Sequence, residues 1–202
     1  MITVESYEIM RFVEHGGKCR TIMDCASGRL LIQRLGDQRG ITKEQIFKWF
    51  RGITGELEKY HRCREGQLYR YLNPYSILVT DEEEIVLLDL STASNGFVME
   101  KMQQLHMKMH FIRIAVQSKD DSGLAVDLYS LGMTIQFILA YTEAYISLTR
   151  REEYLLSRII ERCLGENPKK RYENLMQVQR ELPIITTRKQ KNKQQKRRIL
   201  DI

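Results

Sequence analysis

Two short apolar runs on either side of an acidic turn form the clearest pattern in the middle of the chain. The runs are Ile77 to Val79 and Ile85 to Leu88, and the turn is Asp81 to Glu84. Short runs rich in Val and Ile that flank polar turn residues are typical of a β-hairpin. We therefore predict two antiparallel strands here, with Asp89 directly after the second.

A second hairpin is predicted near the N-terminus. Residues 7–13 and 20–25 are partly apolar, and Gly16 and Gly17 lie between them. Glycine tolerates the positive φ that a tight turn needs, so these two residues suit the connection. The region contains no G-x-G-x-x-G, and a phosphate-binding loop is therefore not expected in it.

The remaining apolar positions predict helices. Thr42 and Gln45 have the spacing of a capping box, which marks the start of a helix. After them, apolar side chains recur every three or four residues, as expected for the buried face of an amphipathic helix. These residues are Ile46, Phe50, Ile53, Leu57 and Tyr60, with Phe47 and Trp49 beside them. Shorter helices are predicted at 29–35, 152–163 and 171–182.

Residues 127–141 are apolar on almost every side, which predicts a helix buried in the core. The run is shorter than the roughly 20 residues that a membrane-spanning helix needs. No other apolar run approaches that length. Asp127 is expected at the N-terminus of this helix, where a carboxylate interacts favourably with the helix dipole.

Composition separates a globular part from a basic tail. The 202 residues are 43% hydrophobic and 29% charged, which fits one domain with a core and a tail. The net charge is +6, but residues 188–198 alone carry seven basic residues and no acidic one. The tail from 184 to 202 is therefore expected to be disordered. It is suited either to keeping the protein soluble or to binding the phosphates of nucleic acid or an anionic membrane.

Cysteine and histidine spacing does not favour a metal site. The four cysteines lie far apart without a C-x-x-C pair: Cys19, Cys25, Cys63 and Cys163. This predicts reduced thiols in a cytoplasmic protein. His106 and His110 are four residues apart, which suits two imidazoles on one metal, but no third ligand is evident.

Several short motifs follow one another in a specific order. Residues 69–71 read Tyr-Arg-Tyr and precede a loop with Pro74; the central hairpin follows and Asp89 ends it. Farther on, D-L-Y-S-L-G begins at Asp127 and N-P-K-K-R begins at Asn167. This order resembles the large lobe of the protein kinase family, in which H-R-D-L-x-x-x-N, two strands and D-F-G occupy the corresponding places.

The resemblance implies an α+β fold, mainly α, with three parts. Residues 1–25 would form a minimal N-terminal β-hairpin and hinge in place of a full small lobe. Residues 26–183 would form a protein-kinase-like C-terminal lobe, and residues 184–202 the tail. The kinase positions that the chain keeps are structural ones: Arg70, Leu72, Pro74, Asp127, Gly132 and Arg171.

The same resemblance implies that the catalytic positions are degenerate. Tyr71 stands in place of the catalytic aspartate, and a neutral phenol with a pKa of about 10 is no base at pH 7. Asn73 replaces a lysine, and Ser76 replaces the asparagine that holds the second magnesium ion. Asp89 alone is left as a candidate metal ligand. We therefore expect no catalytic residue and no cofactor.

These observations predict a catalytically inactive, pseudokinase-like domain that acts as a protein-binding or regulatory scaffold in the cytoplasm. A protein partner is expected on the open hairpin at residues 5–25, because unpaired strand edges pair readily with other chains. The alternative is an atypical phosphotransferase, completed by a partner chain, in which Asp89 helps to bind Mg-ATP weakly.

Overall fold

The computed structural model describes residues 6–37, 40–104, 123–143, 146–165 and 168–183. The strands are β1 (Ser6–His15), β2 (Lys18–Leu30), β3 (Ile77–Thr80) and β4 (Ile85–Leu88). The helices are α1 (Leu31–Asp37), α2 (Lys43–Cys63), α3 (Gly96–Gln104), α5 (Gly123–Thr142), α6 (Arg150–Leu164) and α7 (Leu175–Glu181), with a 3-10 turn η1 at Pro168–Lys170.

Both predicted hairpins are confirmed, and they join in one sheet. β1 and β2 pair antiparallel from Ser6↔Ser27 to His15↔Lys18, which makes them longer than predicted. β1 also pairs with β4 at Ile9↔Leu88, and β2 pairs with β3 at Gly28↔Thr80. Within the described residues, the strands therefore close into an antiparallel barrel in the order β1-β2-β3-β4.

The predicted protein-kinase-like C-terminal lobe with a minimal N-terminal hairpin is wrong. The N-terminal hairpin is not a separate remnant, because each of its strands pairs with a strand of the central hairpin to close the barrel. β2 itself continues past residue 25 to Leu30. Short motifs along the chain report local structure, whereas strand pairing depends on backbone groups that are distant in sequence.

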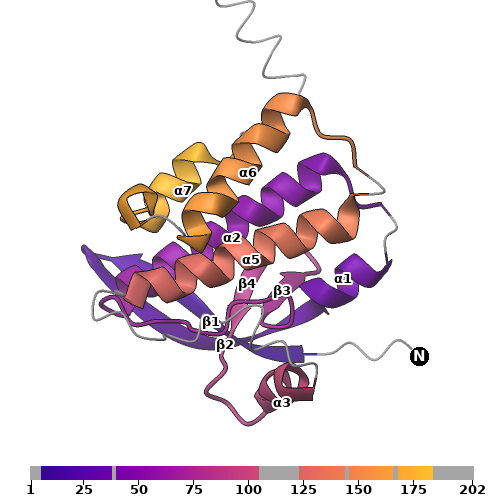
Figure 1. Cartoon of the computed structure of the whole chain (residues 1–202). Helices are drawn as coiled ribbons and strands as arrows, with labels where there is room; N and C mark the ends of the chain where they lie inside the picture. Colours follow the sequence, from indigo (N-terminus) through magenta and orange to yellow (C-terminus); the bar gives the residue numbers. More distant parts are fainter. Residues whose placement is uncertain (1–5, 38–39, 105–122, 144–145, 166–167, 184–202) are drawn as a thin grey trace, which may run out of the picture.

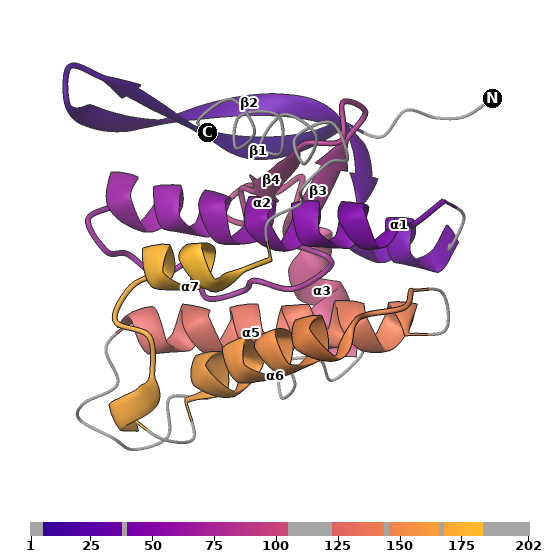
Figure 2. The ribbon, with the colours of Figure 1, turned by 90° about the horizontal axis from the view of Figure 1, so that it is seen from above.

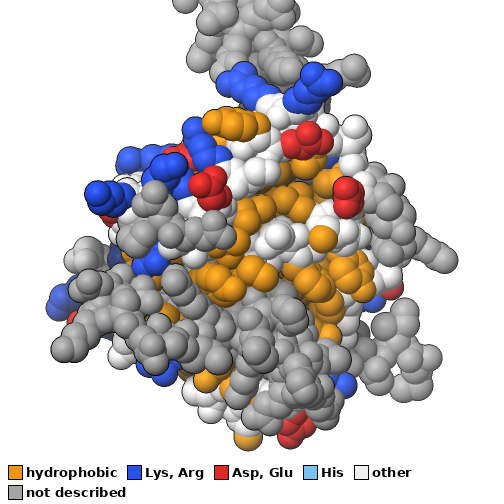
Figure 3. All heavy atoms as spheres, viewed as in Figure 1, with side chains coloured by type: hydrophobic (Ala, Val, Ile, Leu, Met, Phe, Trp, Pro, Cys, Tyr) orange, Lys and Arg blue, Asp and Glu red, His pale blue; other side chains and the backbone are white. Residues whose placement is uncertain are grey.

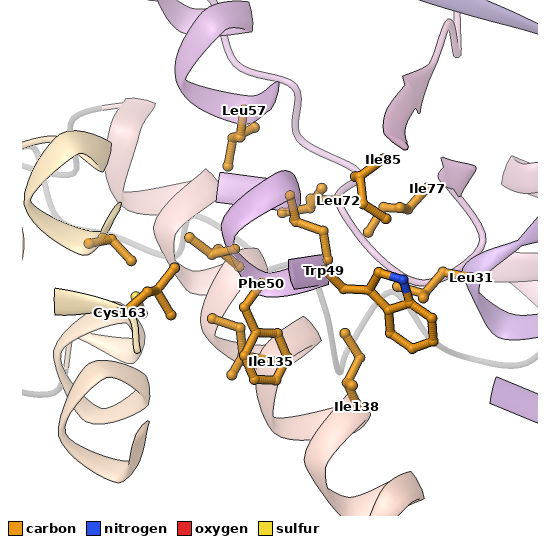
Figure 4. Close-up of a cluster of buried hydrophobic side chains, with 14 of the residues drawn as sticks. Leu31, Trp49, Phe50, Leu57, Leu72, Ile77, Ile85, Ile135, Ile138 and Cys163 are labelled. Atoms are coloured by element: carbon orange, nitrogen blue, oxygen red, sulfur yellow. The ribbon is translucent and has the colours of Figure 1, made fainter. Parts of the chain in front are cut away.

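Helix α2 lies between the strands on one side and α5 and α6 on the other (Figure 2). The predicted aromatic stripe is confirmed as core, since Trp49 and Phe50 are completely buried. Figure 4 shows these rings from α2 beside Ile135 and Ile138 from α5. Gly52 of α2 faces β4 so closely that an added Cβ would lie 2.8 Å from an Ile85 side-chain carbon.

Half of the predicted capping box at the start of α2 is confirmed. The Thr42 hydroxyl accepts a hydrogen bond of 3.1 Å from the Gln45 backbone N–H. The Gln45 side chain does not return to the cap; its amide donates to the Glu83 carboxylate at 2.6 Å. A charged acceptor on the hairpin turn thus competes successfully with the cap backbone.

Helix α5 is longer than predicted, and its length corrects the membrane argument. Its span Leu124–Thr142 is long and apolar enough to cross a membrane, although half of that span is buried inside the protein. Buried side chains such as Leu131 and Ile135 pack it into the core, side by side with α6 (Figure 1). The structure is therefore compatible with a soluble protein in which α5 is the core helix.

A full capping box opens α6 at a T-x-x-E sequence, Thr149 to Glu152. The Glu152 N–H donates to the Thr149 hydroxyl at 3.3 Å, and the Thr149 N–H donates to the Glu152 carboxylate at 2.8 Å. We expect Thr149→Ala to lower the free energy of unfolding by about 1 kcal/mol, measured by urea denaturation. Ser157→Ala, exposed on the same helix, is the control and should cause no loss. Equal midpoints for the two variants would contradict the assigned cap.

Candidate functional site

One buried carboxylate holds the loop at residues 69–76 in place. Asp127 is completely buried, and its carboxylate accepts hydrogen bonds of 2.7 Å from the backbone N–H groups of Tyr69 and Arg70. The same carboxylate lies 2.8 Å from Nε2 of His61, near the end of α2. Asp127 therefore joins three segments that are far apart in sequence. His61 was not identified from the sequence, because nothing local marks its partner.

This arrangement corrects the role predicted for Asp127. Helix α5 begins at Gly123, so Asp127 lies in its second turn and not at its N-terminus. Its carboxylate binds backbone N–H groups of the loop, which replace the expected interaction with the helix dipole. Arg70 has a φ of +68°, a region that residues with a side chain rarely adopt. The hydrogen bond from its N–H helps to hold that conformation.

Tyr69 connects the loop to the barrel. Its hydroxyl is placed to donate to the backbone carbonyls of Leu88, at 2.9 Å, and Ser76, at 3.2 Å. Burial raises the pKa of the Tyr69 hydroxyl far above its ordinary value, so the group is neutral at physiological pH. Tyr69 is thus a structural donor, bonded to β4 and to the residue before β3.

The predicted degenerate positions Tyr71, Asn73 and Ser76 lie together in this loop. The Tyr71 carbonyl accepts from the Ser76 hydroxyl at 2.8 Å and from the Asn73 side-chain amide at 2.5 Å. The Asn73 side-chain oxygen accepts from the Tyr75 N–H at 2.8 Å, and the Pro74 carbonyl accepts from the Ile32 N–H at 3.0 Å. The side-chain bonds hold the loop together, and the backbone carbonyl of Pro74 fastens it to α1.

Asp89 ends β4 and organises the turn that follows. Its carboxylate accepts from the backbone N–H and the hydroxyl of Ser91, at 2.8 and 2.6 Å. Its side chain is nearly buried. Among the residues that the structure describes, no group of three or more potential metal ligands occurs. His106 and His110 lie outside the described residues, and metal binding by Asp89 stays a prediction.

Gly132 and Arg171, the other predicted structural positions, lie at helix contacts. A Cβ on Gly132 would approach the Cys163 Cβ to 2.8 Å, so glycine allows α5 and α6 to pack closely. Arg171 donates to the carbonyl of Gly165 at 3.2 Å and packs against that residue. Gly165 ends α6 with a φ of +69°. Both positions serve packing in this structure.

The tip of the N-terminal hairpin is fastened to the end of α2. Cys19 and Cys63 form a disulfide, with Cα atoms 4.8 Å apart, so the prediction of reduced thiols is wrong for this pair. Arg62 forms an ion pair with Glu14, and Arg64 donates to the Thr21 hydroxyl at 3.2 Å. The other two cysteines are free thiols, Cys25 exposed and Cys163 buried.

Reduction of the Cys19–Cys63 bond is expected to lower the free energy of unfolding by about 2 kcal/mol, because the bond restricts the unfolded chain. Urea denaturation with and without a phosphine reductant measures the loss. Cys25→Ser is the matched control. Its urea midpoints with and without the reductant should equal those of wild type under the same two conditions. If wild type and the Cys19→Ser/Cys63→Ser variant unfold at the same urea concentration, the bond does not contribute.

Comparison with known proteins yields a structural likeness alone. No family model and no curated protein matches the sequence. Among solved structures 155 chains match, one of them the apo form of PpkA-294. It is 18% identical to this chain with a TM-score of 0.56, and the match covers 87% of this chain and 67% of that one. PpkA is a bacterial Ser/Thr kinase. A likeness at this identity concerns the fold and does not assign an activity.

Proposed function

We propose that this chain is a non-catalytic protein-binding module, a regulatory scaffold of the cytoplasm whose partner docks on the open N-terminal hairpin. The observation that carries the proposal is the pairing of β2. Residues 18–27 of β2 pair with β1, whereas pairing with β3 is confined to residues 28–30. Along residues 18–27, the other edge of β2 therefore has no neighbouring strand within the described chain.

Exposed apolar side chains accompany this edge. Ile22 and Met23 of β2 are about half exposed, and Val13 of β1 is 43% exposed. Figure 2 shows that the hairpin extends well beyond β3 and β4. Free backbone donors and acceptors with apolar side chains beside them are what an added β-strand recognises. The fitting partner is thus an extended segment with apolar side chains at alternate positions.

The edge is presented in a fixed orientation. The disulfide between Cys19 and Cys63 and the bond from Arg64 to Thr21 hold the tip of the hairpin on α2. A surface that is already ordered loses less conformational entropy when a partner binds. In a reducing cytoplasm, where disulfides rarely persist, the bond from Arg64 to Thr21 and the ion pair of Arg62 with Glu14 are expected to hold the hairpin tip on α2.

The bonds in the loop at residues 69–76 support the non-catalytic part of the proposal. Side-chain groups of Asn73 and Ser76 bond to loop backbone, and Asp89 bonds to Ser91. Electrostatic groups aimed at the reacting atoms usually supply the largest part of catalysis. Here the side chains of Asn73, Ser76 and Asp89 form hydrogen bonds with their own loop or turn.

A photo-reactive amino acid at position 22 tests the docking surface in cells that express the whole chain. We expect a discrete cross-linked protein from position 22 and none from position 141, where Tyr141 on α5 is similarly exposed. The purified partner should then slow deuterium exchange of the amides at residues 18–27. Equal cross-linking at both positions, or unchanged exchange, would refute docking at β2.

Labelled ATP with Mg²⁺ tests the non-catalytic part separately. We expect no phosphate transfer and no increase in the melting temperature of the protein. Transfer that Asp89→Ala abolishes would instead support the alternative, an atypical phosphotransferase that uses Asp89 for Mg-ATP. Because this assay needs no partner, its result does not depend on the cross-linking experiment.

A further inference from the structure

We propose that the surface formed by α6, η1 and α7 binds single-stranded nucleic acid. A pocket of about 500 Å³ lies between these elements, away from the hairpin edge discussed above. Its basic lining residues are Arg158, Arg162, Lys169, Lys170 and Arg171. Two acidic residues, Glu161 and Glu173, also line it, so the lining has an excess of positive charge. Figure 3 shows Lys and Arg side chains gathered over this part of the molecule.

Two of the guanidinium groups are held in position before any ligand binds. The Arg162 guanidinium lies 3.8 Å from the centre of the Tyr172 ring and donates from Nε to the Lys170 carbonyl at 2.8 Å. Arg162 and Arg158 both donate to the Glu181 carboxylate. Guanidinium groups fixed in this way still have N–H donors for phosphate oxygens, and less entropy is lost on binding.

Glu181 reduces the positive charge of the cluster without cancelling it. Burial acts to raise the pKa of the Glu181 carboxyl, but the Tyr172 hydroxyl and the two arginines outweigh it and hold the pKa below its ordinary value. Glu181 therefore stays ionised and keeps Arg158 and Arg162 in place. With its single charge included, the basic side chains at the pocket still outnumber the acidic ones.

An exposed aromatic ring completes the site. Tyr154 lines the same pocket and is 69% exposed, more than any other large hydrophobic side chain exposed in the described chain. A basic groove follows a phosphate backbone, and an exposed ring beside it stacks on an unpaired base. A duplex keeps its bases stacked on one another, which is why the combination favours a single strand.

The test is fluorescence anisotropy of the whole chain with labelled 15-nucleotide oligo(dT) and oligo(U). Tyr154→Ala should weaken binding about fivefold or more, because a stacked base is lost, while Tyr154→Phe should bind like wild type. The double variant Lys169→Ala with Lys170→Ala should also weaken binding. The slope of log affinity against log salt concentration should become shallower by the amount that about one to two phosphate contacts contribute. The matched controls are the single variant Tyr141→Ala and the double variant Lys18→Ala with Lys48→Ala. Both should bind the oligonucleotide more tightly than the pocket variants do.

Several outcomes would overturn the site. One is unchanged affinity for both pocket variants. Another is complete loss of binding when the seven basic tail residues become Gln in the whole chain, with the pocket variants still like wild type. A third is binding to vesicles of anionic lipid, or to a duplex, in preference to the single strand. None of these results bears on the β2 edge, so the two proposals fail independently.

Discussion

Asp127→Ala is expected to lower the free energy of unfolding by about 3 to 5 kcal/mol, because it leaves buried donors without an acceptor. The carboxylate receives the N–H groups of Tyr69 and Arg70 and contacts His61, and it is completely buried. Removing it leaves the buried Tyr69 N–H, the part-buried Arg70 N–H and the part-buried His61 ring nitrogen without this partner. Arg70 also loses the bond that holds it at positive φ.

Urea denaturation of the whole chain measures this loss. The free energy of unfolding of Asp127→Asn should lie between those of wild type and Asp127→Ala. The asparagine oxygen can accept from one N–H group, but its NH₂ group faces the other donor and cannot accept from it. Asp24→Ala is the matched control: Asp24 is exposed, and its pKa is lowered mainly by a hydrogen bond from Arg11 at the surface. We expect a much smaller loss there, because exposed ion pairs contribute little to stability. If the Asp127 and Asp24 variants unfold at the same midpoint, Asp127 does not organise the loop.

The second large effect is expected at Gly28, where β2 meets β3 and the barrel closes. A Cβ on Gly28 would lie 2.3 Å from the Val79 carbonyl oxygen and 2.8 Å from the Thr80 Cα, both backbone atoms. These atoms cannot move away unless the two strands separate. We therefore expect Gly28→Ala to lower the free energy of unfolding by about 3 kcal/mol or more, beyond the usual cost of an extra methyl group.

Thermal and urea unfolding of Gly28→Ala measure that loss, and deuterium exchange locates it. The amides of residues 28–30, which pair with β3, should exchange faster than in wild type. Gly36→Ala is the matched control. Gly36 lies in α1 with no atom within 4 Å of an added Cβ, so alanine there should leave stability unchanged or raise it by up to about 1 kcal/mol. A tolerated Gly28→Ala would show that the β2–β3 pairing is not tight.

Local patterns predicted the elements of this protein well. The apolar stripe of α2, the acidic turn between β3 and β4, and Gly16 and Gly17 between β1 and β2 each depend on neighbours within a few residues. Such signals are complete in a short window of sequence. The capping box between Thr149 and Glu152 is an equally local signal.

The candidate site was predictable in part. Asn73 and Ser76 are close in sequence, so they had to share the loop that the sequence placed before β3. Their partners within the loop follow from that short spacing. The acceptor of the loop N–H groups, Asp127, is 57 residues away from Arg70, and His61 reaches the same carboxylate from α2. No periodicity links such distant positions.

The amino-acid sequence by itself determined both hairpins, the helices α2, α5 and α6 with the buried faces of α2 and α6, and that the tail is basic; it did not predict α3, and it placed the start of a helix inside β2. The tertiary structure alone decided that both hairpins close one barrel, that Cys19 meets Cys63, and that Asp127 faces the loop. The reason is physical: periodicity and capping act between near neighbours, whereas buried donors, acceptors and thiols take whatever partner the packed chain brings to them.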